Sequence, residues 1–384
     1  MRWLWPLWLF DVLVITSCFN PAFREAIVAG EPSLIMGTPE PWLPTAALPR
    51  LALRELWQFN GLLLSAFNVL YVVRHRRQVR AILFLLAGNA VALAIFGTFQ
   101  KLAGAGGLWF GAVPSPNPRF FATFIYHNHW SAFTLLNTAV CLALLFHHHR
   151  RGDARDVWHS PVPLGAVITL LLAITVPLSA SRSCTLLMAL LLGGALLHLL
   201  LRVIRRRRAG GRSAVAPATG ILVVATLALA AVTYLGRASF HERLQQTSQQ
   251  LSQGGGDLVA SRLTLYRDTW NMAREKPWFG WGLESYAHVF RVFNTQRAAE
   301  TWVWIPFYAE AHNDWLQALA EVGFVGTLLL VLLGVLPLAS LDWRQISSMV
   351  PRYLLAGCAL LALYAWVEFP FANPAVLLTF SALF

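Results

Sequence analysis

Charged side chains are scarce in this chain of 384 residues. Asp, Glu, Lys and Arg together make up 12% of it, whereas hydrophobic residues make up 57%. A soluble domain is usually about one quarter charged, so this shortage argues against a soluble globular protein. Cysteine is scarce too, because Cys18, Cys141, Cys184 and Cys358 are scattered and form no CxxC pair. Their spacing argues against a disulfide framework or a cysteine metal site and favours four small hydrophobes.

Acidic residues are few and form no cluster of the kind that binds a divalent cation, so we expect no metal cofactor. Basic residues outnumber them, and the net charge is +12 at pH 7. A basic chain can indicate nucleic-acid binding. Here the arginines cluster in short loops between apolar runs, which the positive-inside rule of membrane proteins explains. We therefore expect a lipid bilayer and no nucleic acid as partner.

Long apolar runs are what the chain has in place of charge. A membrane-spanning helix needs about 20 mostly apolar residues. The predicted spans are 3–19, 56–73, 80–99, 130–146, 162–179, 184–201, 219–235, 315–337 and 353–369. A last apolar run, 374–384, is too short to span and leaves open whether the chain is truncated. The sequence thus predicts an all-α polytopic membrane protein with about 9–10 transmembrane helices.

Basic clusters predict the orientation of these spans. Segments 74–80, 147–155 and 202–208 fall on one side, which is then cytoplasmic. The loop 236–313 falls on the opposite side and is far longer than an ordinary connector, which suggests a function.

That loop divides the chain into N-terminal transmembrane helices (1–235), the loop itself (236–313) and C-terminal transmembrane helices (314–384). Within the loop, the first half of SRLTLYRDTWNMAREKPWFGWGLESYAHVF has helical apolar spacing and predicts an amphipathic helix. Pro277 should end that helix, and the turn at Gly280–Gly282 should follow.

A polar triplet, His312, Asn313 and Asp314, stands at the start of the predicted span 315–337. Asn313 or Asp314 suits the N-cap of that helix. Capping does not explain His312, which precedes the cap. A histidine at the aqueous edge of a helix is a candidate general base, and the helix dipole favours an anion beside it.

Arginines on the same predicted side supply candidate anion ligands. Arg182 lies between two predicted spans and either snorkels at a helix end or lines an anion site. Arg262 and Arg267 are five residues apart and do not share a helix face, so each is a candidate and each could be merely solvated. Glu368, at the outer end of a span, should pair with one of the arginines. Two arginines and a histidine at a membrane face suit a lipid-linked pyrophosphate.

Several of these stretches together resemble the O-antigen ligase and O-antigen polymerase family. The resemblance is carried by SASRS (179–183), by the loop sequence quoted above (261–290) and by AHNDWLQALAEVGFVG (311–326). FATFIYHNHWSAF (121–133) adds a further piece, and the match extends over about residues 85–384.

The resemblance implies a multi-pass glycosyltransferase of the bacterial inner membrane, with a fold similar to the C class and a periplasmic active site. Members take a glycan from undecaprenyl pyrophosphate and transfer it to lipid A-core, a polysaccharide or a protein hydroxyl. The family reaction needs no metal and inverts the anomeric centre. By motif match, His312 is the expected base, or orients the acceptor. By the same match, Arg182 and Arg262 are the expected pyrophosphate ligands, with Arg267 as second choice to Arg262. The expected supporting residues are Asn313, Asp314 and His129.

Two other classes of protein remain as alternatives. A transporter or flippase of lipid-linked sugars would need polar residues near the middle of its spans, where the sequence offers little besides Asn89 and Asn137. A structural membrane protein would use the arginines only as anchors. The gathering of polar groups at one face favours the interfacial enzyme.

Overall fold

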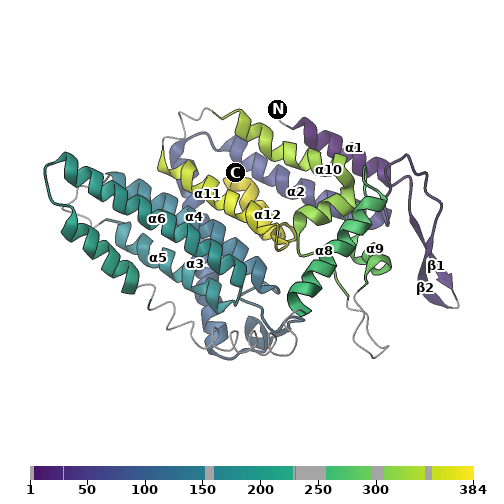
Figure 1. Ribbon diagram of the computed structural model, residues 1–384, viewed down its shortest axis with the longest axis horizontal. Helices are drawn as coiled ribbons and strands as arrows, with labels where there is room; N and C mark the ends of the chain where they lie inside the picture. The colour runs from purple at the N-terminus through teal and green to yellow at the C-terminus, as the bar shows by residue number, and fades with distance from the viewer. Residues whose placement is uncertain are drawn as a thin grey trace. The chain divides into compact units, whose positions relative to one another are not determined.

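The structure is a computed structural model that describes residues 4–28, 30–151, 160–227, 230, 257–295, 307–341 and 348–384. Helices dominate this part of the chain, which confirms the predicted all-α polytopic class (Figure 1). Among the described residues, four helices are long and apolar enough to cross a membrane: α3 (Arg76–Leu102), residues His127–His148 of α4 (His127–Arg151), α6 (Arg182–Ala209) and α10 (Asp314–Ala339).

Further helices overlap the other predicted spans and the last apolar run, 374–384. They are α1 (Trp5–Ser17), α2 (Pro49–Val72), α5 (Val162–Leu178), Val215–Leu227, α11 (Met349–Tyr364) and α12 (Pro374–Leu383). The predicted span 353–369 extends too far, since α11 ends at Tyr364. The acid and the proline in the following VEFPF suit a turn better than a helix, and the 3-10 turn η4 (Pro370–Ala372) lies there.

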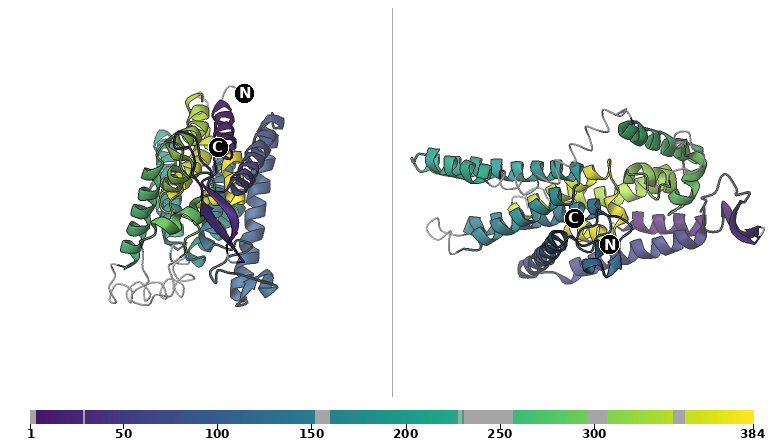
Figure 2. Two further views of the ribbon diagram at one scale, coloured as in Figure 1. Left: turned by 90° about the vertical axis from the view of Figure 1, so that its right-hand side faces the viewer. Right: turned by 90° about the horizontal axis from the view of Figure 1, so that it is seen from below.

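The described residues fall into two compact units. Unit 1 takes its residues from Met1–Asn68, Gln250–Gln345 and Ala365–Pro374. In it α1 packs against α10, and α8 (Asp257–Glu275) packs against both α10 and α9 (Tyr286–Phe293). An antiparallel hairpin, β1 (Phe23–Val28) and β2 (Glu31–Met36), stands at the edge of this unit (Figure 2). The sequence had given no indication of this hairpin.

Unit 2 takes its residues from Val69–Gln249, Ile346–Tyr364 and Ala375–Phe384. Its central helix is α4, which packs against α3, α5, α6 and α11. Within the apolar window of α4, 89% of the residues are buried. A short ladder of β3 (Gly107–Leu108) and β4 (Val113–Pro114) follows α3.

The amphipathic helix expected in the long loop is α8, and it ends at Glu275, just before Pro277 as predicted. Leu265 and Met272 are buried in the core of unit 1, together with Trp281 from the following turn. The polar sequence from 241 to 256 lies outside the described residues.

A break inside α10 ties that turn to the membrane helix. Gly323 has φ 65° and ψ −172°, a conformation open to glycine but not to side-chain-bearing residues. The turn supplies the hydrogen bonds that the broken helix loses: Trp281 N donates to Ala320 O (3.0 Å), and Phe324 N donates to Pro277 O (2.8 Å). Gly280 also has a positive φ, and a Cβ there would collide with the Glu321 carbonyl.

Candidate active site

The N-terminus of α10 is capped and anchored by the two residues that follow His312. The Asn313 side chain accepts a hydrogen bond from Leu316 N at 3.0 Å, which confirms the predicted N-cap. Asp314 binds the segment after α11: its N donates to Ala365 O (2.9 Å), and its Oδ2 accepts from Phe371 N (3.0 Å). Together these bonds bring residues 365–371 against the start of α10.

His312 itself has a backbone conformation that is unusual for its type. Its φ is 53°, in the left-handed region that costs a non-glycine residue about 1–3 kcal/mol. Tyr266 on α8 donates its hydroxyl proton to the His312 carbonyl at 2.9 Å and so holds this backbone. The edge of the His312 ring lies against Phe369, with ring centroids 4.9 Å apart. Such strain is typical of functional positions, where the surroundings force one side-chain direction.

Glu368 joins His312 to Arg262. Its Oε2 lies 3.2 Å from His312 Nδ1, and its Oε1 accepts from Arg262 Nη2 at 2.8 Å. Arg262 also donates from Nη1 to Val367 O at 3.3 Å. The Glu368 side chain is only 4% exposed, whereas that of Arg262 is 45% and that of His312 26% exposed. A buried carboxylate therefore holds two side chains that reach the surface.

The charge state of Glu368 decides which ring nitrogen of His312 carries a proton. Burial raises the pKa of Glu368, but the hydrogen bond and charge of His312, and then Arg262, outweigh it and lower that pKa below its usual value. The ionised carboxylate can only accept hydrogen bonds, so His312 Nδ1 carries a proton. In the neutral ring Nε2 is then the basic nitrogen, the arrangement that a general base needs.

The contacts that join His312 and Arg262 through Glu368 form the Glu368 bridge, and Arg267 takes no part in it. Its Nη2 donates to Thr295 Oγ1 at 3.1 Å, and its Nε is 3.5 Å from Asp268 Oδ1. The fully buried Asp268 accepts from both Thr295 N (2.8 Å) and Thr295 Oγ1 (2.7 Å) through Oδ2. Arg267 thus covers a bond between α8 and the end of α9, while Arg262 faces His312.

Arg182 and His129 belong to unit 2. Arg182 is exposed on the first turn of α6, where the described residues provide no hydrogen bond or ion pair to its side chain. The residue before it, Ser181, is hydrogen-bonded to Tyr364 through the two hydroxyls at 3.0 Å. His129 is half-buried on the first turn of α4, with its ring edge against Tyr126.

The two motif segments of unit 2 lie side by side. Ser131 Oγ and Ser179 Oγ are 2.7 Å apart, and Cys184 Sγ donates to Ser131 O at 3.2 Å. These bonds join the start of α4, which carries His129, to the start of α6, which carries Arg182. Both segments stand out in the sequence, but nothing in the sequence indicates that they are in contact.

The sequence alone predicts one of the two contacts of the Glu368 bridge. It predicted that Glu368 pairs with an arginine, which the Arg262 contact confirms. It missed the contact of Glu368 with His312 and the supporting roles of Tyr266 and Phe369. The one available signal was an acid in an otherwise apolar, aromatic run near the end of the chain.

Residues 167–331 match a family model described as O-antigen ligase. This region is similar to the O-antigen ligase family. The predicted resemblance is thereby confirmed, and the matched ligase region includes Arg182, Arg262, Arg267 and His312 but neither Glu368 nor His129. No curated protein matches the chain. Family and spanning helices together indicate a multi-pass membrane protein with an O-antigen-ligase-like role in glycan transfer.

Proposed function

We propose that this protein transfers a glycan from undecaprenyl pyrophosphate to an acceptor hydroxyl at the periplasmic face of the bacterial inner membrane, without a metal and with inversion. The observation that carries the proposal is the buried Glu368 bridge. One carboxylate contacts both Arg262, a side chain suited to binding pyrophosphate, and His312, a candidate base. The acceptor is lipid A-core, another polysaccharide or a protein.

In the proposed reaction, His312 Nε2 takes the proton of the acceptor hydroxyl while Nδ1 stays bonded to Glu368. The acceptor oxygen attacks the anomeric carbon from the face opposite the pyrophosphate. The bond from that carbon to the pyrophosphate oxygen breaks, and its electron pair leaves with the pyrophosphate. Arg262 stabilises the developing negative charge, and Arg182 is proposed as a second cation. Attack from the opposite face inverts the anomeric centre.

Other residues support this geometry. Asn313 and Asp314 fix the start of α10, and Tyr266 fixes the backbone of His312. Arg267 stays a weaker candidate for the pyrophosphate, because it is engaged with Thr295 and Asp268. His129 is proposed to support the site from the first turn of α4.

A flippase of lipid-linked sugars is less well supported. The polar side chains inside α4 that such a path would use, Thr134, Asn137 and Thr138, are all 0% exposed. Buried polar groups of this kind stabilise helix packing and do not line a path for a sugar.

The decisive experiment uses a strain that lacks the gene, complemented at matched membrane levels with wild type, His312→Ala or His312→Asn. Asparagine tolerates the left-handed backbone better than alanine, so it separates loss of the base from loss of the fold. We expect both variants to accumulate undecaprenyl-linked glycan and to lose transferred product, by about 10²- to 10⁴-fold in rate. Wild-type product levels in the asparagine variant would refute a catalytic His312.

A further inference from the structure

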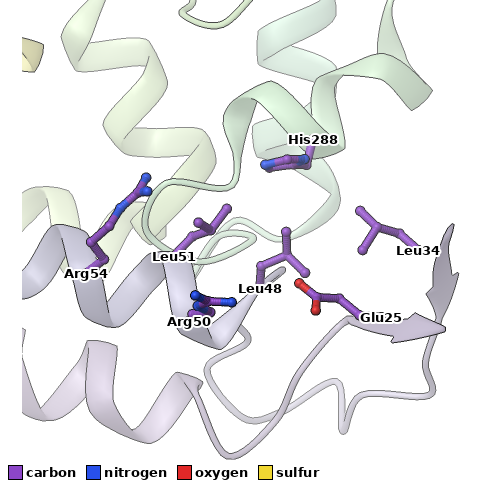
Figure 3. Close-up of a pocket in the computed structure, with 7 residues that line it drawn as sticks. All are labelled: Glu25, Leu34, Leu48, Arg50, Leu51, Arg54 and His288. Atoms are coloured by element: carbon purple, nitrogen blue, oxygen red, sulfur yellow. The ribbon is translucent and has the colours of Figure 1, made fainter. Parts of the chain in front are cut away.

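A cavity of about 630 Å³ opens in unit 1, away from the Glu368 bridge. Hairpin β1–β2, the start of α2 and helix α9 form its walls (Figure 3). It is lined by Glu25, Leu34, Leu48, Arg50, Leu51, Arg54 and His288. Its volume falls within the range of small-molecule sites, roughly 300–1,000 Å³. None of the roles proposed above uses any of these side chains.

The lining combines apolar walls with convergent polar groups. Three leucines supply the apolar surface, and Arg50, Arg54 and His288 supply donors. Figure 3 shows the side chains of Glu25 and Arg50 pointing toward one another from β1 and α2. A few placed polar groups on an apolar wall are typical of a site that binds an amphipathic ligand.

Arginine chemistry narrows the ligand to an anion. Arg54 is 3.7 Å from Glu284, with side chains 66% and 41% exposed, and an exposed pair of this kind contributes little. Its guanidinium can therefore exchange that partner for a ligand. Two guanidinium groups with a histidine match the oxygens of a phosphate monoester, and a carboxylate such as Glu25 accepts hydrogen bonds from sugar hydroxyls.

We propose that this cavity binds a phosphate monoester carried on a saccharide or a lipid. A further step rests on the proposed function: the ligand of this cavity is the acceptor, because the donor pyrophosphate is assigned to Arg262. Arg50 and Arg54 bind the phosphate, Glu25 binds a hydroxyl, and the leucines pack against the apolar part of the ligand.

Hydrogen bonds connect this cavity to the residue before His312. Glu284, the partner of Arg54, donates its backbone N to Glu321 Oε2 at 3.1 Å. Gln317 Nε2 lies 3.5 Å from Glu321 Oε1, and Gln317 Oε1 accepts from Ala311 N at 2.9 Å. The chain of contacts offers a physical route by which an occupied cavity affects the start of α10.

The test measures binding alone, with purified full-length protein in lipid nanodiscs. The probes are glucose 1-phosphate, dodecyl phosphate and, as a neutral match, dodecyl maltoside. The variants are Arg50→Glu combined with Arg54→Glu, and Arg24→Glu as control. Arg24 neighbours Glu25 on β1, so it points to the opposite face of the strand. Arg262→Ala reports on the donor site.

We expect at least one phosphate probe to bind saturably, with an affinity roughly tenfold lower in the double variant and unchanged in Arg24→Glu and Arg262→Ala. Binding of glucose 1-phosphate would identify a sugar phosphate, and binding of dodecyl phosphate alone would identify a lipid phosphate. Equal affinity in wild type and in the double variant would overturn the proposal, provided that the double variant keeps the wild-type melting temperature. A loss of phosphate binding in Arg262→Ala alone would overturn it too.

The acceptor role has its own readout. If the cavity binds acceptor, the double variant raises the acceptor KM and leaves the donor KM unchanged. If the strain lacking the gene still forms transferred product, the proposed function fails, while the binding result still decides whether the cavity takes a phosphate.

Discussion

Two arginines of the region that matches the O-antigen ligase model are held in opposite ways. Arg262 in unit 1 is fixed by a buried carboxylate at 2.8 Å, whereas Arg182 in unit 2 is exposed and has no hydrogen-bond or ion-pair partner among the described residues. A left-handed residue stands two positions before a helix at each place: Ala180 before α6, which begins with Arg182, and His312 before α10. The difference teaches that the contacts of unit 1 hold Arg262 in place before any ligand binds, whereas the side chain of Arg182 is left unconstrained by the described residues.

Preorganisation has an expected kinetic signature. Groups already held in place lose little freedom when the transition state forms, so they act mainly on kcat. A group ordered only by the ligand acts mainly on binding. The variants below separate these two cases.

Among the variants that test this comparison, Arg262→Ala has the largest expected effect. It removes the charge that we propose stabilises the leaving pyrophosphate, so kcat should fall by about 10²- to 10³-fold in a transfer assay. Arg267→Gln is the matched control, five residues along the same helix, and should change kcat by only a few-fold. Equal losses of kcat in the two variants would contradict the proposal that Arg262, held by Glu368, acts in catalysis while Arg267, beside Asp268, does not.

Next in size is Glu368→Gln, which keeps the shape of the side chain but removes its charge. Misplacing His312 and Arg262 should lower kcat by about 10²-fold, with a smaller change in donor KM. Glu368→Asp should restore part of the activity, because the carboxylate remains. A variant that loses stability but keeps wild-type kcat would show that the bridge is only structural.

The same variant has a pH signature in thermal unfolding. The pKa of Glu368 is lowered in the folded protein, so the stability it contributes is present above its ordinary pKa and is lost as pH falls through the lowered value. The melting temperature of wild type should therefore exceed that of Glu368→Gln most at neutral pH, and the gap should close in acid.

Arg182→Ala should act differently from Arg262→Ala. Because Arg182 has no described partner to lose, the melting temperature should stay the same, while the donor KM rises roughly tenfold, or 1.4 kcal/mol. A large loss of kcat at unchanged donor KM would mean that Arg182 is as preorganised as Arg262.

The smallest effect is that of Glu310→Gln, two residues before His312. Burial raises the pKa of Glu310 from 4.5 to about 7, with Glu284 and Glu55 adding to the rise and the Gln317 hydrogen bond opposing it. Its contribution to stability is thus greatest below its ordinary pKa and is lost as pH rises through about 7. The variant should melt a few degrees above wild type at pH 8 and match it near pH 4.

The sequence alone predicted what depends on local pattern. Apolar runs gave the membrane helices, Asn313 gave the cap of α10, and Pro277 gave the end of α8. It could not predict the contacts of Glu368, which lies 56 residues from His312 and 106 from Arg262. The left-handed backbone of His312 and the break at Gly323 depend equally on contacts from distant segments, Tyr266 on α8 and the turn at Pro277–Gly282.

The break at Gly323 also has a consequence for how the protein is made. A helix interrupted inside a bilayer exposes backbone groups that lipid cannot satisfy, which costs several kcal/mol for each group. The segment that satisfies them, Pro277–Gly282, is synthesised before α10. It is therefore available as soon as α10 leaves the insertion machinery, so the order of residues along the chain lets the kinked helix enter the membrane with its partner already present.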